Sequence, residues 1–174
     1  FTIYTDLYNY NFVDAVKELA QQAGVKIDFD NINKKNTFNK IEEILNIACK
    51  WYQSNLDNEE ASNCNQYLKN RKLSKETIEK FKLGFSFNSK TSLYEYLKKL
   101  SYTDAELLSS NVIKLDKNDK IKDYFYKRLI FPIMNEQGKV VGFGGRALDD
   151  SNPKYINSPE SNFFQKRYLL YNLD

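Results

Sequence analysis

The stretch Leu129-Ile-Phe-Pro-Ile-Met134, with Lys139-Val-Val-Gly-Phe-Gly-Gly-Arg146 after it, decides the fold. Two apolar runs rich in β-branched and aromatic residues flank a short polar turn, which predicts a β-hairpin. Gly138 can supply the positive φ that such a turn requires. Pro132 has no N–H to donate to a strand ladder, so we expect its strand at a sheet edge or with its N–H side free.

Residues 112–125, just before this hairpin, have apolar residues with a period of two, whereas the segments before residue 111 have the helical period. Val112–Leu115 and Ile121–Phe125 flank a second turn and predict another hairpin. Helices are predicted over residues 11–23, 39–52, 58–71, 74–83, 91–99 and 103–109, with Asn39–Glu42 and Thr103–Glu106 as capping boxes. Residues 28–36 show no period and indicate a linker. The fold class is therefore α+β: helices in the N-terminal half, followed by a small, mainly antiparallel β-sheet.

Gly142-Phe-Gly-Gly-Arg-Ala147 formally matches the dinucleotide fingerprint G-x-G-x-x-A. That fingerprint requires a helix to begin at the glycines, so that its N-terminus meets a pyrophosphate. Asp149-Asp-Ser-Asn-Pro153 follows too closely to leave room for such a helix. We interpret the segment instead as a strand whose glycines allow another backbone or a nucleic acid strand to approach.

The composition of the chain excludes several classes of site. With 174 residues the chain can form a real core, and no apolar run reaches the length of a membrane span. There is no His, and Cys49 and Cys64 are not in a CxxC pair, so neither a His-based triad nor a zinc site of N and S ligands can form within it. We expect both cysteines to be buried thiols of a reducing cytoplasm.

The net charge of +3 is unevenly distributed. Residues 69–99 carry 9 basic and 3 acidic side chains, and residues 120–174 carry 9 and 6, whereas residues 100–119 carry 2 and 4. Charge alone favours an ordinary solvated surface rich in Lys. The alternative is that the two basic blocks converge on a groove that neutralises phosphates.

Two basic residues near the hairpin are candidates for phosphate contacts. Arg146 ends the glycine-rich strand, and its guanidinium can donate two parallel hydrogen bonds to phosphate oxygens. Lys154 lies in Pro153-Lys-Tyr-Ile-Asn-Ser-Pro159, where two prolines restrict the loop and fix the ammonium. We interpret both as exposed. Beside them, Tyr155 is the one aromatic residue that we expect to contact nucleic acid, by stacking on a base.

Taken in order, the hairpin, the glycine strand ending on Arg146, the Pro-bounded Lys154 and Phe164-Gln-Lys-Arg-Tyr-Leu-Leu-Tyr171 resemble the DnaG-type DNA primases of bacteria. The resemblance implies three parts. Residues 1–27 would be the tail of an N-terminal zinc-binding domain whose ligands lie upstream. Residues 28–38 would be a linker, and residues 39–174 the N-terminal subdomain of the catalytic core, ending before the metal-binding TOPRIM domain.

Such a primase is a nucleotidyltransferase, a DNA-directed RNA polymerase that makes RNA primers for DNA replication. The resemblance implies that Arg71, Arg146, Lys154, Lys166 and Arg167 belong to its basic face and hold single-stranded template and primer–template. It places no catalytic or metal-binding residue in this chain, and the chain alone is expected to be inactive. Zn²⁺ and Mg²⁺ or Mn²⁺ are expected in the full-length protein.

Further expectations concern partners and location. The family implies a primosome protein that meets the replicative helicase through a C-terminal domain not contained in this chain. We expect a monomer with no membrane association, in the bacterial cytoplasm at the nucleoid or in an organelle. Two other readings stay open: a noncatalytic module that binds single-stranded DNA or loads a helicase, and a protein–protein adaptor with a basic surface.

Overall fold

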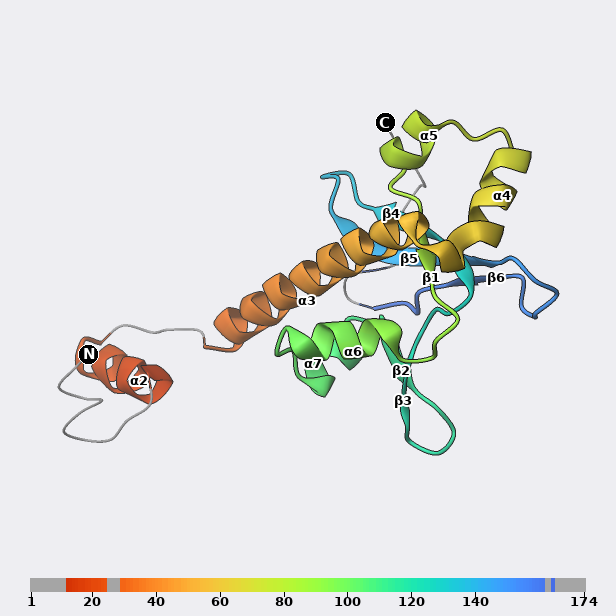
Figure 1. Cartoon of the computed structure of the whole chain (residues 1–174). Helices are drawn as coiled ribbons and strands as arrows, with labels where there is room; N and C mark the ends of the chain where they lie inside the picture. Colours follow the sequence, from red (N-terminus) through yellow and green to blue (C-terminus); the bar gives the residue numbers. More distant parts are fainter. Residues whose placement is uncertain (1–11, 25–28, 162–163, 165–174) are drawn as a thin grey trace. The chain divides into compact units, whose positions relative to one another are not determined.

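The predicted hairpin forms the centre of the sheet in the computed structural model, which describes residues 12–24, 29–161 and 164. Strand β4 (Arg128–Met134) pairs antiparallel with β5 (Val140–Ala147), and Gly138 in the turn has φ +72°. Two short strands complete the sheet in the order β1-β4-β5-β6 (Figure 1). They are β1 (Gly84–Ser86) and β6 (Tyr155–Asn157), and the sequence predicted neither of them.

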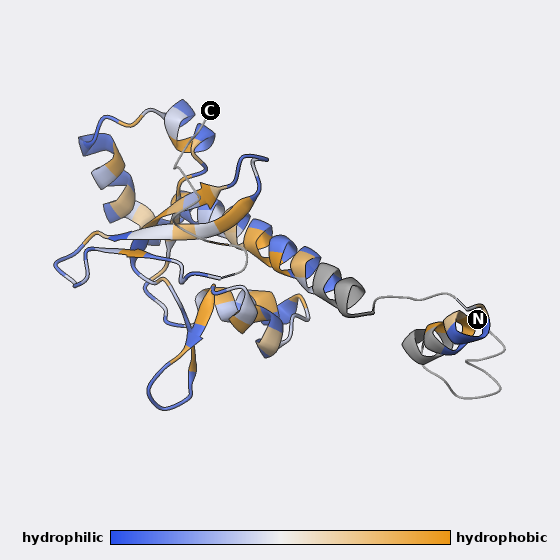
Figure 2. Ribbon diagram, turned by 180° about the vertical axis from the view of Figure 1, so that it is seen from behind, coloured by the Kyte–Doolittle hydropathy of each residue, from blue (hydrophilic) through white to orange (hydrophobic). Residues whose placement is uncertain are grey.

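Pro132 lies in a strand that has a neighbour on each side, so the expectation of an edge strand is wrong. The other possibility, a strand in which the N–H side of Pro132 is free, fits the structure, because β1 pairs only with residues 128–130 and ends before it reaches Pro132. The second predicted hairpin is confirmed as a separate two-stranded sheet of β2 (Ile113–Leu115) and β3 (Ile121–Asp123). In Figure 2 the turn at its tip is hydrophilic.

The helices agree with the sequence at most of their ends. They are α2 (Phe12–Gln22), α3 (Phe29–Ser54), α4 (Ser62–Asn70), α5 (Lys75–Lys80), α6 (Ser92–Lys99) and α7 (Asp104–Ser109), with short 3₁₀ turns at Asn55–Asp57 and Glu59–Ala61. The capping box of Thr103 and Glu106 is confirmed. None of the helices in the described ranges is long and apolar enough to cross a membrane. The fold class is thus α+β, as predicted.

Helix α3 corrects the sequence prediction at its start. It begins at Phe29, so the segment predicted as a linker is largely helical and Asn39 is an interior residue rather than an N-cap. Helix propensities are weak, and extending an existing helix adds a hydrogen bond for each residue fixed, so polar residues can continue it. The chain divides into the compact units Phe1–Asn36 and Thr37–Asp174. The assignment of three functional parts stays a prediction.

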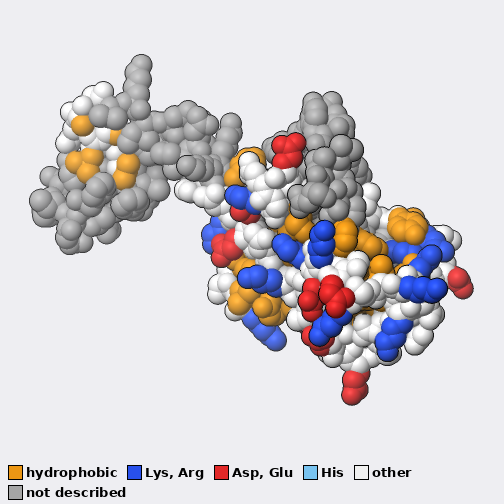
Figure 3. Space-filling view, turned by 90° about the horizontal axis from the view of Figure 1, so that it is seen from above, with side chains coloured by type: hydrophobic (Ala, Val, Ile, Leu, Met, Phe, Trp, Pro, Cys, Tyr) orange, Lys and Arg blue, Asp and Glu red, His pale blue; other side chains and the backbone are white. Residues whose placement is uncertain are grey.

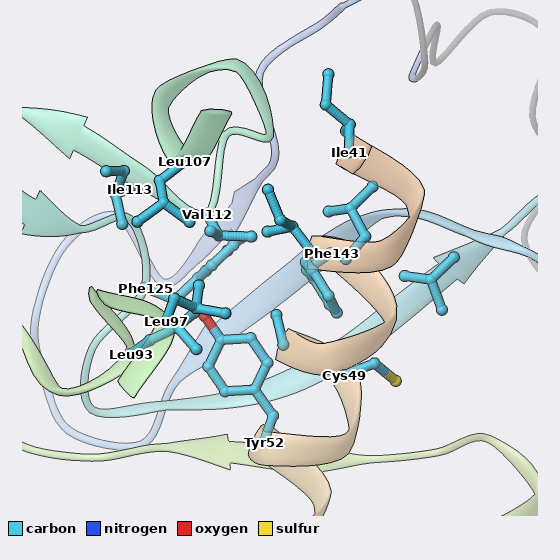
Figure 4. Close-up of a cluster of buried hydrophobic side chains, with 14 of the residues drawn as sticks. Ile41, Cys49, Tyr52, Leu93, Leu97, Leu107, Val112, Ile113, Phe125 and Phe143 are labelled. Carbon is cyan, nitrogen blue, oxygen red and sulfur yellow. The ribbon is translucent and has the colours of Figure 1, made fainter. Parts of the chain in front are cut away.

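One face of α3 packs on the core of the larger unit. Ile41, Ile44, Leu45, Ala48 and Tyr52 are buried at helical spacing, as predicted. Figure 4 shows their cluster meeting side chains of α6, α7 and the sheet, such as the fully buried Phe143, and the fully buried Phe125 from the segment between β3 and β4. Because this core fixes one face of the sheet, the other face is left for α4, α5 and the candidate site.

A second, smaller cluster lies on that other face, where α4 and β1 contact β4. Its buried members include Leu56, Cys64, Leu68, Phe85 and Leu129. Both cysteines are buried and free, as expected.

The helix predicted over residues 74–83 ends at Lys80, and Gly84, directly after the predicted range, begins β1. A Cβ on Gly84 would lie 2.6 Å from the backbone carbon of Tyr52, so the strand passes directly against α3. Lys82 takes the positive φ, 49°, after the helix.

Candidate nucleic-acid interface

Arg146 and Tyr155 face each other across the β5–β6 pair, on the side of the sheet that carries the second cluster. The Arg146 Nε donates to the Tyr155 Oη at 3.1 Å. Its guanidinium carbon lies 4.2 Å from the centre of the Tyr67 ring, which α4 supplies. Arg146 is only 8% exposed, so the expectation of an exposed arginine is wrong. The sheet register and the helix above it enclose this side chain between two aromatic rings.

Arg71 joins the same group from the end of α4. Its Nε donates to the Tyr67 Oη at 2.9 Å, and its guanidinium lies 5.3 Å from that ring. The next residue, Lys72, has φ 57° and so adopts the left-handed conformation that glycine usually supplies after a helix. Tyr67, Arg71, Arg146 and Tyr155 together form what we call the arginine–tyrosine cluster.

No pattern in the sequence distinguishes Tyr67 from the other 12 of the 13 tyrosines as a member of this cluster. Its spacing of four residues from Arg71 is the one available signal, since side chains four apart share a helix face. Figure 3, seen from the side of α4 and α5, shows Lys and Arg side chains gathered over this end of the larger unit. The structure thus brings an arginine of the first basic block to an arginine of the second.

Lys154 is exposed, as predicted, and its loop is held by a residue that the sequence analysis did not single out. The guanidinium of Arg128 is buried and donates to the carbonyl oxygens of Pro153 at 2.9 Å and Lys154 at 3.2 Å. The Ala147 N–H donates to the same Lys154 oxygen at 2.8 Å. Burial lowers the pKa of Arg128, and nearby Asp149 acts in the opposite direction. Arg128 therefore fixes the backbone that presents Lys154.

A groove lies between hairpin β2–β3, the segment after β3 and the loop that follows β5. It consists of two adjoining pockets of about 350 and 270 Å³ that share Lys114 and Tyr126. We call it the lysine groove. Tyr126 is its exposed aromatic residue, and its lysines are Lys90, Lys114, Lys117, Lys122 and Lys127.

The groove carries a surplus of positive charge. Lys122 pairs with Asp116, and Lys127 lies 3.9 Å from Asp149. Within the described part of the chain, Lys90, Lys114 and Lys117 have no carboxylate partner, although Lys114 lies over the Tyr124 ring at 5.0 Å. Two of these lysines, Lys114 and Lys117, come from residues 100–119, where acidic side chains outnumber basic ones. Only the folding of the hairpin places them beside Lys90 and Lys127.

Asp123 also lines the groove, but its carboxyl group is buried and is bonded to backbone N–H groups. Its carboxylate is 3% exposed and accepts from the N–H groups of Leu93 at 2.8 Å and Tyr94 at 2.9 Å, at the first turn of α6. Burial raises the pKa of this carboxyl to about 7, although the two N–H groups act in the opposite direction. Asp123 therefore caps a helix from a neighbouring strand.

The remaining predicted site residues, Lys166 and Arg167, lie outside the described residues. Within the described ranges, no three His, Cys, Asp or Glu side chains are grouped so that they could hold a metal ion. The described residues thus offer no ligand set of this kind for a zinc or magnesium ion. The fingerprint reading of Gly142–Ala147 also fails in the structure, because these residues lie within β5 and β6 follows.

The chain is similar to known proteins in both sequence and structure. Residues 51–174 match the family described as DNA primase catalytic core, N-terminal domain. The chain is 38% identical over 171 residues to a DNA primase of Clostridium acetobutylicum, a match that covers 95% of the chain and 28% of that protein. It is 37% identical to a DNA primase of Buchnera aphidicola over 94% of the chain and 28% of the relative. The chain thus spans less than a third of these relatives.

Two solved structures are similar at the level of the fold. One is a DnaG primase catalytic domain bound to ssDNA, with a TM-score of 0.73 and 31% identity, over 80% of this chain and 45% of that one. Another is the RNA polymerase domain of Mycobacterium tuberculosis primase DnaG with a double-stranded DNA oligomer that has a 6-nucleotide overhang. Its TM-score is 0.69 at 30% identity, over 74% of this chain and 40% of that one.

Proposed function

Because this chain belongs to the family of the DNA primase catalytic core, N-terminal domain, we propose that it is the lobe of a DNA primase that holds single-stranded template and primer–template. The whole protein would be a template-directed nucleotidyltransferase that makes RNA primers. The support is the similarity to primases along nearly the whole chain and to catalytic domains that were solved with single-stranded and overhanging DNA.

The lysine groove is the observation that carries the proposal. A single strand presents one negative charge for each nucleotide, and lysines that neutralise phosphates release the strand's counterions. Lys90, Lys114 and Lys117 are free of carboxylate partners in the described part of the chain and lie along one groove. Tyr126, 42% exposed, lies where the two pockets join and offers a ring for a base. The combination of lysines and an exposed ring is typical of single-strand binding.

The arginine–tyrosine cluster has a different part in this proposal. Because Arg146 is buried, we do not assign it an exposed contact to a phosphate. It acts by holding Tyr155 and by adding positive potential to the surface above it. Arg71 is the exposed charge of this cluster, and Lys154 is the exposed residue that precedes Tyr155 in the chain; we assign both the contacts to primer–template phosphates. Lys166 and Arg167 are assigned to the same surface on the family pattern alone.

Several parts of the proposal concern the whole protein. Its metal ions would be bound by residues outside this lobe. Zn²⁺ would stabilise the zinc-binding domain, and Mg²⁺ or Mn²⁺ would activate the triphosphate. The replicative helicase would be contacted by a separate C-terminal domain. We also propose a monomeric protein of the bacterial cytoplasm that acts at the nucleoid.

A binding experiment tests the proposal. Fluorescence anisotropy with a labelled single strand, at several salt concentrations, should give a log–log slope of about −2 to −3, since each phosphate contact on a single strand contributes roughly −0.7. The triple variant Lys90→Gln, Lys114→Gln and Lys117→Gln should flatten this slope. Lys75→Gln, with its partner Glu79 on the outer surface of α5, is a matched control for removing one charge.

The outcome separates the candidate functions. A flat salt dependence, or a slope that the triple variant leaves unchanged, would contradict the groove. Binding by the chain combined with primer synthesis by the full-length protein supports the primase. Binding without synthesis by the full-length protein would support a noncatalytic module, and an adaptor should not bind single strands at all.

A further inference from the structure

Hairpin β2–β3 carries three lysines of the lysine groove but is held to the larger unit mainly at its base. It projects beside α6 and α7 (Figure 1). Among its six strand residues, all of them in the described part of the chain, only the directly paired Ile113 and Asp123 are buried. A two-stranded hairpin is marginally stable by itself, so this pair decides where the groove lysines Lys114, Lys117 and Lys122 lie.

The two residues of this pair join the hairpin to different partners. Ile113 belongs to the main core cluster, as an apolar residue can. Asp123 binds the segment that begins α6: its N–H donates to the Lys90 carbonyl oxygen at 2.7 Å, and its carboxylate accepts from two N–H groups in the first turn of the helix at 2.8 and 2.9 Å. Asp123 therefore fixes the backbone of Lys90, a further groove lysine, against the strand that carries Lys122.

Helix α6 has no side-chain cap of its own. Its N-cap residue, Thr91, makes no capping hydrogen bond with its side chain within the described ranges, and the Thr91 Oγ1 lies 3.1 Å from the Glu95 Oε1 instead. A local cap would fix the helix alone, whereas the carboxylate of Asp123, 30 residues from Leu93, also fixes the hairpin. Burying a carboxylate costs free energy that an apolar residue would avoid, so helix stability alone does not explain Asp123.

We propose that Asp123 is a positioning residue for strand binding, which holds Lys90 and the lysines of hairpin β2–β3 close enough for one strand to contact both. This role rests on the proposed function of the lysine groove. Asp123 acts through the lysines and does not touch the strand. Its charge acts in the opposite direction, because an ionised Asp123 lines the groove and repels phosphates. The other charged and titratable groups around it are Tyr52 on α3, Glu95 on α6, Asp116 and Tyr126 of the same pocket, and the groove lysines.

The opposite signs of position and charge give a test at pH 8, where Asp123 is ionised because burial raises its pKa only to about 7. Fluorescence anisotropy of a labelled oligo(dT) measures the affinity and its salt dependence. Asp123→Ala removes the acceptor and should weaken binding about fivefold at about 0.1 M salt, the counterion contribution of one phosphate contact, with a log–log slope smaller by about 0.7.

Asp123→Asn is the conservative variant, because it keeps one acceptor oxygen and loses only the charge. At pH 8 it should bind at least as tightly as the wild type. At about pH 6, where most wild-type molecules have a protonated Asp123, any advantage of Asp123→Asn should disappear.

A double-mutant cycle tests whether Asp123 acts through the groove lysines. Lys90→Gln should weaken binding by the wild type about fivefold at the same salt concentration, and it should have a smaller effect in the Asp123→Ala background, where Lys90 is no longer held. Ser74→Ala is the matched control for a lost helix cap, because the Ser74 side chain caps α5 by accepting from the Thr77 N–H at 3.2 Å. It should leave strand binding unchanged.

Tighter binding by both Asp123→Ala and Asp123→Asn would overturn the proposal, since Asp123 would then act only as a charge in the groove. Unchanged binding by Asp123→Ala, or additive effects of Asp123→Ala and Lys90→Gln, would also overturn it and leave the proposed function intact. No binding by the wild type at low salt would overturn both. If circular dichroism shows that Asp123→Ala does not fold, Asp123→Glu replaces it: this variant keeps the charge but displaces it by one methylene, and it should bind more weakly than the wild type.

Discussion

The guanidinium carbon of Arg146 lies 4.2 Å from the centre of the Tyr67 ring, so a residue of the sheet is held by a residue of α4. The same arginine donates to the Tyr155 Oη on β6. A charge over an aromatic face in a largely dry environment is stabilising, and removing it leaves the surrounding groups unpaired. This contact ties α4 to the face of the sheet that carries Arg146 and Tyr155.

Arg146→Ala should therefore destabilise the chain, by about 2 kcal/mol, through loss of the cation–π contact and of a charged hydrogen bond. Lys154→Ala, at an exposed position, should change the free energy of unfolding by less than about 0.5 kcal/mol. Urea denaturation measures both. Binding of single strands should then be compared per folded molecule. If Arg146→Ala were as stable as the wild type, the aromatic enclosure would not contribute to the fold.

Arg128→Met should release the loop that carries Lys154. The methionine keeps much of the side-chain volume but leaves the carbonyl oxygens of Pro153 and Lys154 without their charged donor. We expect faster amide hydrogen exchange at Ala147 and its neighbours and several-fold weaker strand binding, with a smaller effect on α6. Exchange followed by NMR measures the loop. Unchanged protection at Ala147 would show that the two prolines alone fix the segment.

Asp123 predicts a dependence of stability on pH. Burial raises the pKa of this carboxyl from 3.8 to about 7 in the folded chain. The protonated form is therefore favoured by folding. The stabilising contribution is complete below about pH 4 and is lost as the pH rises to about 7, with each pKa unit worth about 1.4 kcal/mol.

Comparison with Asp123→Asn isolates this contribution. The variant does not titrate there and retains one acceptor for the N–H groups of Leu93 and Tyr94. The wild type should lose stability relative to Asp123→Asn between pH 4 and pH 7 in urea denaturation. A difference that stays constant over this range would mean that the two N–H bonds keep the carboxyl ionised throughout.

The chain by itself should make no primers when template, ribonucleoside triphosphates and Mg²⁺ or Mn²⁺ are supplied. Phosphoryl transfer of this kind requires metals held between protein carboxylates and the triphosphate, and the described residues contain no such group. Radiolabelled product on a denaturing gel measures synthesis, and the full-length protein is the positive control. Metal-dependent synthesis that survives repurification of the 174-residue chain would contradict this prediction.

Local chemistry in the sequence determined the hairpin of β4 and β5, the second hairpin, the capping box at Thr103 and the buried face of α3. Each depends on residues that are neighbours in the chain, so apolar period, turn glycine and cap can be read directly. The family pattern added Arg71 and Arg146, and in the structure both arginines contact the ring of Tyr67. It also added Lys166 and Arg167, which lie outside the described residues.

Tertiary structure decided the rest. Strand β1 forms because Gly84 fits against the backbone of Tyr52 and pairs with Ile130, both far away in sequence. Short strands of this kind carry little local preference, since strand formation depends on what lies opposite. Whether a basic residue is exposed is likewise a property of its neighbours. Arg146 is buried because α4 places a ring over it, whereas Lys114 became part of a groove because hairpin β2–β3 folds beside β6.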